Sequence, residues 1–123
     1  MREVRSQDWP RFCEAVNRNE RGGRLHVHKV ELNGAKIEVA KNAAFDAIEF
    51  GRRDDCNDRI AIRMMGEKST EHEILEPIRI QLAETENGAA FQSVVVEAED
   101  GTTILTFHPT LRREWLSEIQ LTE

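Results

Sequence analysis

The sequence predicts a mainly β (α+β) protein, an up-and-down antiparallel meander of about eight strands curled into a half-barrel or barrel. The first observation is the stretch 77–107, where apolar and polar residues alternate from Ile78 to Leu82, as in a half-buried strand. The second is that turn signals at 87–88 and 100–101 divide this stretch into three strands. The third is that segments with helical spacing flank the strands. We therefore expect one domain, 1–123, with a helix at 6–21, the meander at 24–107 and a short helix at 110–119.

Two hairpins give the stretch its expected layers. A two-residue turn at 100–101 pairs Val96 with Leu105. A three-residue loop at 86–88 pairs Ile78 with Val96 and requires a left-handed glycine at position 88. The predicted core layers are Ile78/Val96/Leu105 and Ile80/Val94/Phe107.

The N-terminal helix is predicted from an apolar stripe and from its ends. Ser6 or Asp8 is a suitable N-cap, and Pro10 is tolerated in the first turn. Gly22-Gly23 ends the helix. The stripe needs an apolar surface to cover, and the sheet provides it. Its members are Trp9, Phe12, Cys13 and Val16.

Strand pairing before residue 77 places the histidines. A two-residue turn at Asn33-Gly34 pairs His28 with Val39. Further along, alternation pairs His72 with Ile62, and Pro77 then redirects the chain. We therefore expect His26, His28 and His72 to face the inside of the curled sheet.

Composition sets the expected partners. The chain has 123 residues and a formal net charge of -6, which disfavours nucleic-acid binding. It has no apolar stretch long enough to span a membrane and no apolar leader, so we expect a cytoplasmic protein with reduced thiols and no membrane partner. No cofactor motif occurs, so no cofactor is predicted.

The three histidines are the candidate ligand or metal site. His26 and His28 lie two residues apart, so a strand places both on one face. Imidazoles bind zinc or iron, with His72 or Cys56 as a third ligand. The alternative is that the histidines line the sheet and form only local hydrogen bonds.

Two other segments have competing interpretations. The acidic segment 54–58 lacks the glycine of a calcium loop and fits a solvated turn, where neighbouring anions disfavour a Cys56 thiolate. The C-terminal helix carries Trp115 and Leu116, which either pack on the sheet or form an interaction surface.

Turn and core motifs resemble a known family. They are Trp9-x-x-Phe12, Gly22-Gly23, Glu84-x-Glu86-Asn87-Gly88, and Glu97-x-x-Asp100-Gly101-Thr102 followed by Phe107. Together they resemble a family of small bacterial proteins of unknown function across nearly the whole chain. The resemblance implies a fold and no activity.

Two functions follow. The first is a non-catalytic binding or structural module that self-associates as a homo-oligomer, through a sheet edge or a terminal helix. The second is a small-molecule or metal site, catalytic or not, in the mouth of the curved sheet near His26, His28 and His72.

Overall fold

The computed structural model describes residues 1–52, 58–66 and 69–122. Over these residues it has one 9-stranded antiparallel sheet and one α-helix, so the mainly β prediction with an N-terminal helix is confirmed. The strands are β1 (Arg2–Val4), β2 (Arg24–Glu31), β3 (Lys36–Arg52), β4 (Asp58–Met65), β5 (Thr70–Leu75), β6 (Pro77–Glu84), β7 (Ala90–Ala98), β8 (Gly101–Arg112) and β9 (Leu121–Thr122). The helical segments are η1 (Ser6–Asp8), α1 (Trp9–Glu20) and η2 (Arg113–Leu116).

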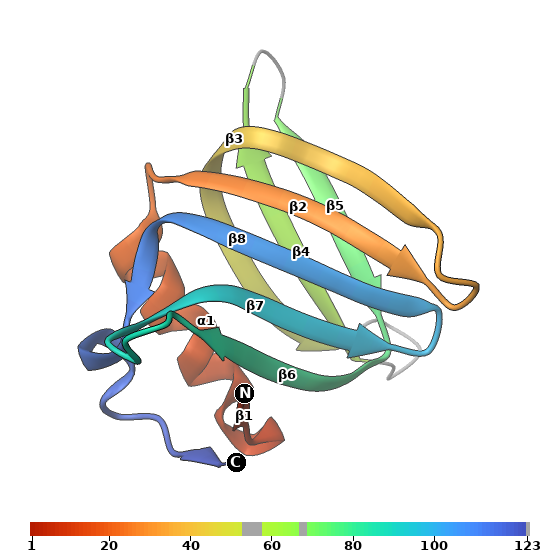
Figure 1. Ribbon diagram of the computed structural model, residues 1–123. Helices are drawn as coiled ribbons and strands as arrows, with labels where there is room; N and C mark the ends of the chain where they lie inside the picture. The colour runs from red at the N-terminus through yellow and green to blue at the C-terminus, as the bar shows by residue number, and fades with distance from the viewer. Residues whose placement is uncertain (53–57, 67–68, 123) are drawn as a thin grey trace.

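The sheet is a meander with one break. Its order is β5-β4-β3-β2-β8-β7-β6-β1-β9, so the first and last long strands, β2 and β8, pair with each other. That pairing would complete a barrel, but β5 and β6 are not hydrogen-bonded neighbours. The result is an open half-barrel rather than a closed barrel (Figure 1).

The break lies where a single residue, Glu76, separates β5 from β6. A hairpin commonly needs at least two loop residues, so these strands do not fold back on each other. Glu76 has a φ of 52°, and its N–H donates to the Asp58 carbonyl at 3.0 Å. Pro77 has no N–H to offer a neighbouring strand. The prediction that Pro77 redirects the chain is confirmed.

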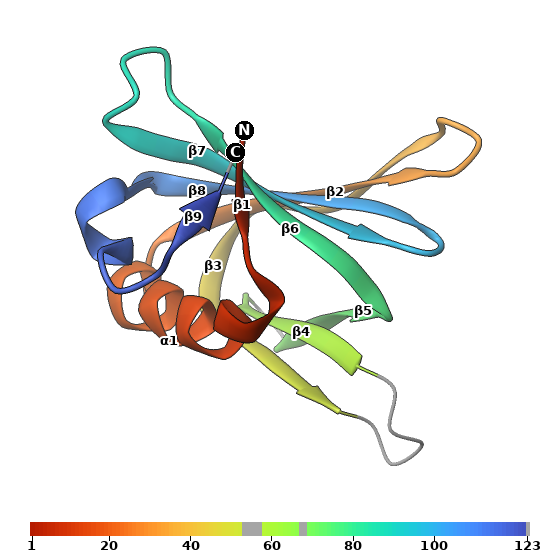
Figure 2. The ribbon, with the colours of Figure 1, turned by 90° about the horizontal axis from the view of Figure 1, so that it is seen from below.

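Helix α1 lies on the concave side of the curled sheet, at the end where it packs against β3 and β8 (Figure 2). Its apolar stripe is buried as predicted, with Phe12 and Val16 at 0% exposure. Trp9 donates from its indole N–H to the Val4 carbonyl at 3.0 Å and meets the Phe50 ring edge-on at 5.4 Å. The core therefore lies between α1 and the inner sheet face.

The β7–β8 hairpin turns one residue earlier than predicted, and this moves the cross-strand pairing by two residues. Ala98 pairs with Gly101, so the turn residues are Glu99 and Asp100 rather than Asp100 and Gly101. The faces are kept, because a shift of two residues preserves alternation. The layer that contained Ile78 is wrong, since that side chain is 58% exposed.

The β6–β7 loop is longer than the three residues predicted. Thr85 N–H donates to the Ala90 carbonyl at 2.9 Å, and Gly88 N–H donates to the Thr85 carbonyl at 2.9 Å. Gly88 has a φ of 69°, so its predicted left-handed conformation is confirmed. This loop and the register shift between Ala83 and Glu84 together move Ile80 opposite Val96. The observed layers are Ile80/Val96/Thr103 and Leu82/Val94/Leu105.

The β2–β3 hairpin has a three-residue loop, not the two-residue turn predicted. Gly34 N–H donates to the Glu31 carbonyl, and Glu31 N–H donates to the Ala35 carbonyl, both at 2.8 Å. This is the pattern of a type I turn followed by a left-handed glycine. The extra residue shifts the register by one, so His28 pairs with Glu38 instead of Val39.

The β4–β5 register agrees with the prediction. Ile60 pairs with Ile74, and Ile62 pairs with His72. The β3–β4 register is two residues away from the predicted one, because Phe50 pairs with Ile60. The turn at 66–69 lies partly outside the described residues.

Both chain ends differ from the prediction. Residues 2–4, expected as a tail, form β1 against β6, where Val4 is buried. At the other end β8 continues to Arg112, so the predicted helix 110–119 is only the 3-10 turn η2. His108-Pro109, expected to end the sheet, is a cis peptide inside β8. It lies in the register jump between Thr106 and Leu111, and proline is tolerated at such a bulge.

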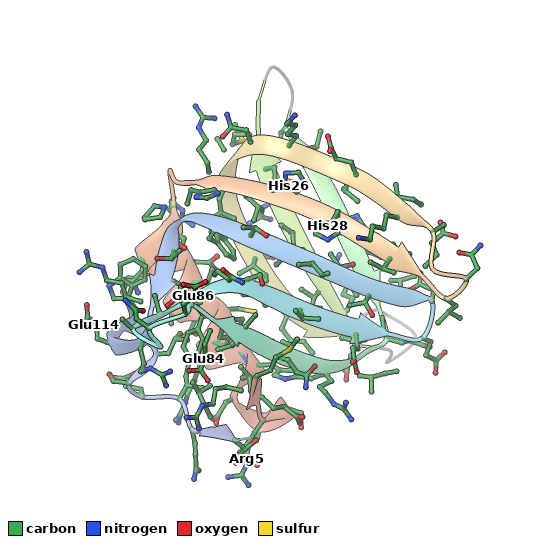
Figure 3. All side chains as sticks on the ribbon, in the orientation of Figure 1. Arg5, His26, His28, Glu84, Glu86 and Glu114 are labelled. Carbon is green, nitrogen blue, oxygen red and sulfur yellow. The ribbon has the colours of Figure 1, made fainter. Side chains whose placement is uncertain are left out.

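Glu84 joins the two ends of the chain. Its carboxylate accepts from Arg2 Nε at 3.2 Å and from Arg113 Nη2 at 2.8 Å. Arg113 Nε also donates to the Gly88 carbonyl at 3.0 Å, and its guanidinium lies 4.9 Å from the Phe91 ring centre. Figure 3 labels Glu84 beside this region. The contacts hold β1, the β6–β7 loop and η2 together.

Candidate functional site

His26 and His28 lie on the outer, convex face of β2. Their neighbours Leu25 and Val27 are at 0% exposure in the core, and alternation turns the two histidines the other way. The imidazole centres are 5.8 Å apart with an interplanar angle of 73°. Figure 3 labels both on β2. The prediction that they face inward is wrong, because the β2–β3 loop has one residue more than assumed.

An uncharged patch surrounds the pair on the convex face. Cross-strand pairing forms one row through His28, Ile104 and Val95, and a second through His26 and Thr106. All these side chains are half-buried, and no helix crosses this side in Figure 1. We call this surface the convex patch. It comprises His26, His28, Val30, Gln81, Ala83, Ser93, Val95, Thr102, Ile104 and Thr106.

Charged side chains stand at the rim of the convex patch. On the β6 side, Arg79 bridges Glu3 at 3.3 Å and Glu97 at 3.4 Å. On the β3 side, Glu38 is the cross-strand partner of His28. The rim therefore carries both signs, while the centre carries none.

His72 lies on the opposite, inner face of the sheet. It is two residues from buried Ile74 on β5, so the two side chains share a face. Burial lowers the pKa of His72, Lys29 lowers it further, and Asp100 opposes both. Lys29 Nζ lies 2.8 Å from Asp100 Oδ2. Thr103, which pairs with Lys29, is 2% exposed. We call Lys29, His72, Asp100 and Thr103 the inner polar cluster. The three histidines of the predicted site therefore do not converge.

The C-terminal candidates are separated by burial. Leu116 is 2% exposed and belongs to the core, whereas Trp115 is half-buried. Trp115 lines a groove of about 540 Å³ between α1 and the segment after β8. Arg11 and Arg18 of α1 line the same groove, but Glu14 and Glu118 balance their charge. Of the two residues, only Trp115 offers surface to a partner.

Metal-binding capacity in the described ranges is limited to pairs. No group of three His, Cys, Asp or Glu side chains there is arranged to hold an ion. Cys56, a predicted third ligand, and residues 54–57 of the acidic segment lie outside the described residues.

Comparison with known proteins places the chain in a family. The model of a family of unknown function (DUF5335) matches residues 1–114. The chain belongs to this family. The resemblance seen in the turn and core motifs is thus confirmed, and family membership assigns no activity. Neither the curated proteins nor the solved structures contain a match. None of the helices in the described ranges has the length and apolarity needed to cross a membrane.

The sequence reasoning missed Glu20. This last residue of α1 is 1% exposed, and neither carboxyl oxygen has a hydrogen-bond partner among the described residues. Burial raises the pKa of Glu20 to about 7. The signal was present in the sequence, because Glu20 extends the stripe of Phe12 and Val16 by one further helical step.

The thiol of Cys13 is unreactive. Burial raises the pKa of its thiol to about 12, and Glu49 and Glu14 add to the effect. The thiolate is the reactive form, so a thiol with this pKa is a poor nucleophile at neutral pH. Cys13 therefore acts as a core residue.

Proposed function

We propose that the chain is a binding or structural module, not an enzyme, that self-associates through its convex patch. The observation that supports this most strongly is the patch itself, a half-buried and uncharged sheet face with no helix over it. Two sheets can pack face to face with their strands nearly aligned, and this face presents no charge that would oppose such packing.

Charge supports a second copy as the occupant. Each chain has a formal net charge of -6, so two copies repel over most of their surfaces. A contact between copies costs least where neither presents a charge, and the convex patch is such a region. Its rim carries both signs, so no ring of like charge surrounds the contact.

A single symmetry operation brings the two central rows of the convex patch together. A twofold axis that runs across the strands, between the His28–Ile104–Val95 row and the His26–Thr106 row, stacks β2 on β2 and β8 on β8. It places Ile104 of one copy against Thr106 of the other. Such isologous contacts are the commonest way to form a dimer.

The size of the patch predicts a weak dimer. From strand spacing and residue rise, its area is roughly 400 Å² on each copy. Stable interfaces bury about 800 Å² on each partner. Curvature of the sheet narrows the contact further, so the dimer is expected only at high protein concentration.

Sedimentation equilibrium in EDTA tests the proposal. Wild-type protein should dimerise as concentration rises, and Ile104→Lys should remain monomeric, because it places like charges at the twofold axis. Ile78→Lys is the matched control, since Ile78 is 58% exposed but lies outside the convex patch. A wild type that stays monomeric, or an Ile104→Lys variant that dimerises like wild type, would refute the proposal.

A second candidate is a site for a small anion at the inner polar cluster. What favours it is that Lys29, His72 and the Thr103 hydroxyl lie on the inner sheet face at the end away from α1, where an anion would compete with Asp100 for Lys29. The probe is inorganic phosphate, added while NMR records the resonances of Lys29 and His72. Shifts that disappear in Lys29→Met would support the site, and unchanged resonances would exclude it.

A further inference from the structure

We infer that His26 and His28 are half of a zinc site that a second copy completes, so that zinc joins two chains. The inference rests on the proposed contact between convex patches. It names the metal ion that would bind between the two convex patches.

The spacing of the two rings suits one ion. Two imidazoles that bind zinc at about 2.0–2.1 Å with a tetrahedral angle have ring centres about 5 Å apart. The observed separation of the His26 and His28 centres is 5.8 Å. Small side-chain rotations close this difference, and both rings already lie on the same face of β2.

One chain alone leaves the ion half coordinated. Zinc in a structural site takes four ligands, and the described residues supply no third acidic, thiol or imidazole ligand to this pair. Glu38 pairs with His28 in the sheet, but it does not complete such a group. Two coordination positions therefore remain for ligands from elsewhere.

The twofold axis supplies those ligands. It passes between His26 and His28, so His26 of one copy faces His28 of the other. Packed sheets stand about 10 Å apart, which places an ion halfway at about 5 Å from each backbone, within reach of an imidazole. Two rings from each copy then surround one position, and the four nitrogen ligands suit zinc.

Zinc would also offset the small area of the contact. A ligand that binds only the dimer shifts the dimer equilibrium by its concentration relative to its dissociation constant. Zinc at one hundred times that constant therefore raises the association constant about 100-fold. The weak dimer expected in EDTA becomes a stable one.

The test is sedimentation equilibrium with and without zinc chloride, together with calorimetric titration of zinc. Wild type should bind one zinc for two chains and dimerise about 100-fold more tightly at that zinc excess. His28→Ala should lose the zinc effect and keep the weak dimer seen in EDTA. His108→Ala is the control, because His108 is an exposed histidine on β8 outside the pair.

The outcomes separate the two proposals. One zinc for each chain, or zinc binding that leaves the dimer equilibrium unchanged, overturns the shared site and leaves the proposed contact intact. A zinc-linked dimer that persists in Ile104→Lys refutes the contact through the convex patch. A zinc effect that persists in His28→Ala overturns the assignment of the ligands.

Discussion

Glu20 gives the sharpest stability prediction. Its carboxyl is 1% exposed without a hydrogen-bond partner among the described residues, and burial raises its pKa from 4.5 to about 7. The folded state therefore holds this proton more tightly than the unfolded state does. The associated stability is complete below pH 4.5 and is lost as the pH rises through about 7.

The magnitude follows from the two pKa values. Each pKa unit corresponds to about 1.4 kcal/mol, so ionisation of Glu20 costs the folded state about 3 kcal/mol above pH 7. That is a large part of the roughly 5–15 kcal/mol expected for a domain. Glu20→Gln removes the ionisation and keeps the shape, so its stability relative to wild type should rise by about 2–3 kcal/mol from pH 5 to pH 8.

Urea unfolding of wild type and Glu20→Gln at several pH values measures this difference. Glu14→Gln, an exposed substitution on the same helix, is the control for effects of net charge. The reasoning fails if the stability difference between wild type and Glu20→Gln is the same at pH 5 and pH 8.

Two further predictions concern the open end of the half-barrel. Gly101→Ala should destabilise the fold by about 1–3 kcal/mol in urea unfolding, because a Cβ there would lie 2.5 Å from the Val30 carbonyl oxygen. Gly51→Ala, with no atom within 4 Å of its Cβ, is the control, and equal losses would contradict the prediction. By NMR titration, Lys29→Met should raise the pKa of His72 and Asp100→Asn should lower it, because these charges act on that imidazole in opposite directions. No shift in either variant would contradict the placement of the cluster.

The fold was predictable where side chains decide the pairing. The β4–β5 register was predicted correctly. Ile74 is the apolar residue of β5 available to pair with Ile60, and Pro77 limits how far β5 extends. The β2–β3 register was wrong because an Asn-Gly pair fits both a two-residue turn and a three-residue loop. Only the loop length distinguishes the faces, and loop length is a property of the folded backbone.

The chain ends were beyond local reasoning. β1 has Val4 as its only buried side chain, and its strand conformation depends on pairing with β6, far away in sequence. The sequence His108-Pro109 is typical of a strand end. The bulge that tolerates this proline becomes visible only in the register jump opposite Phe91 and Ser93.

The candidate site was predicted in part. The His26–His28 spacing correctly predicted two imidazoles on one face. The face that they occupy is set by Leu25 and Val27, which alternate with them and are buried. The assumed two-residue turn placed the histidines on that buried face instead. His72 faces inward as predicted, so the three histidines fail to converge because His26 and His28 face outward.

The most direct test of self-association through the convex patch is an isotope-filtered NOE experiment on a mixture of labelled and unlabelled chains. The twofold contact predicts cross-peaks between the methyl groups of Ile104 on one chain and Thr106 on the other. Intermolecular cross-peaks confined to Ile78 or Trp115, or none at concentrations where dimer forms, would contradict the account.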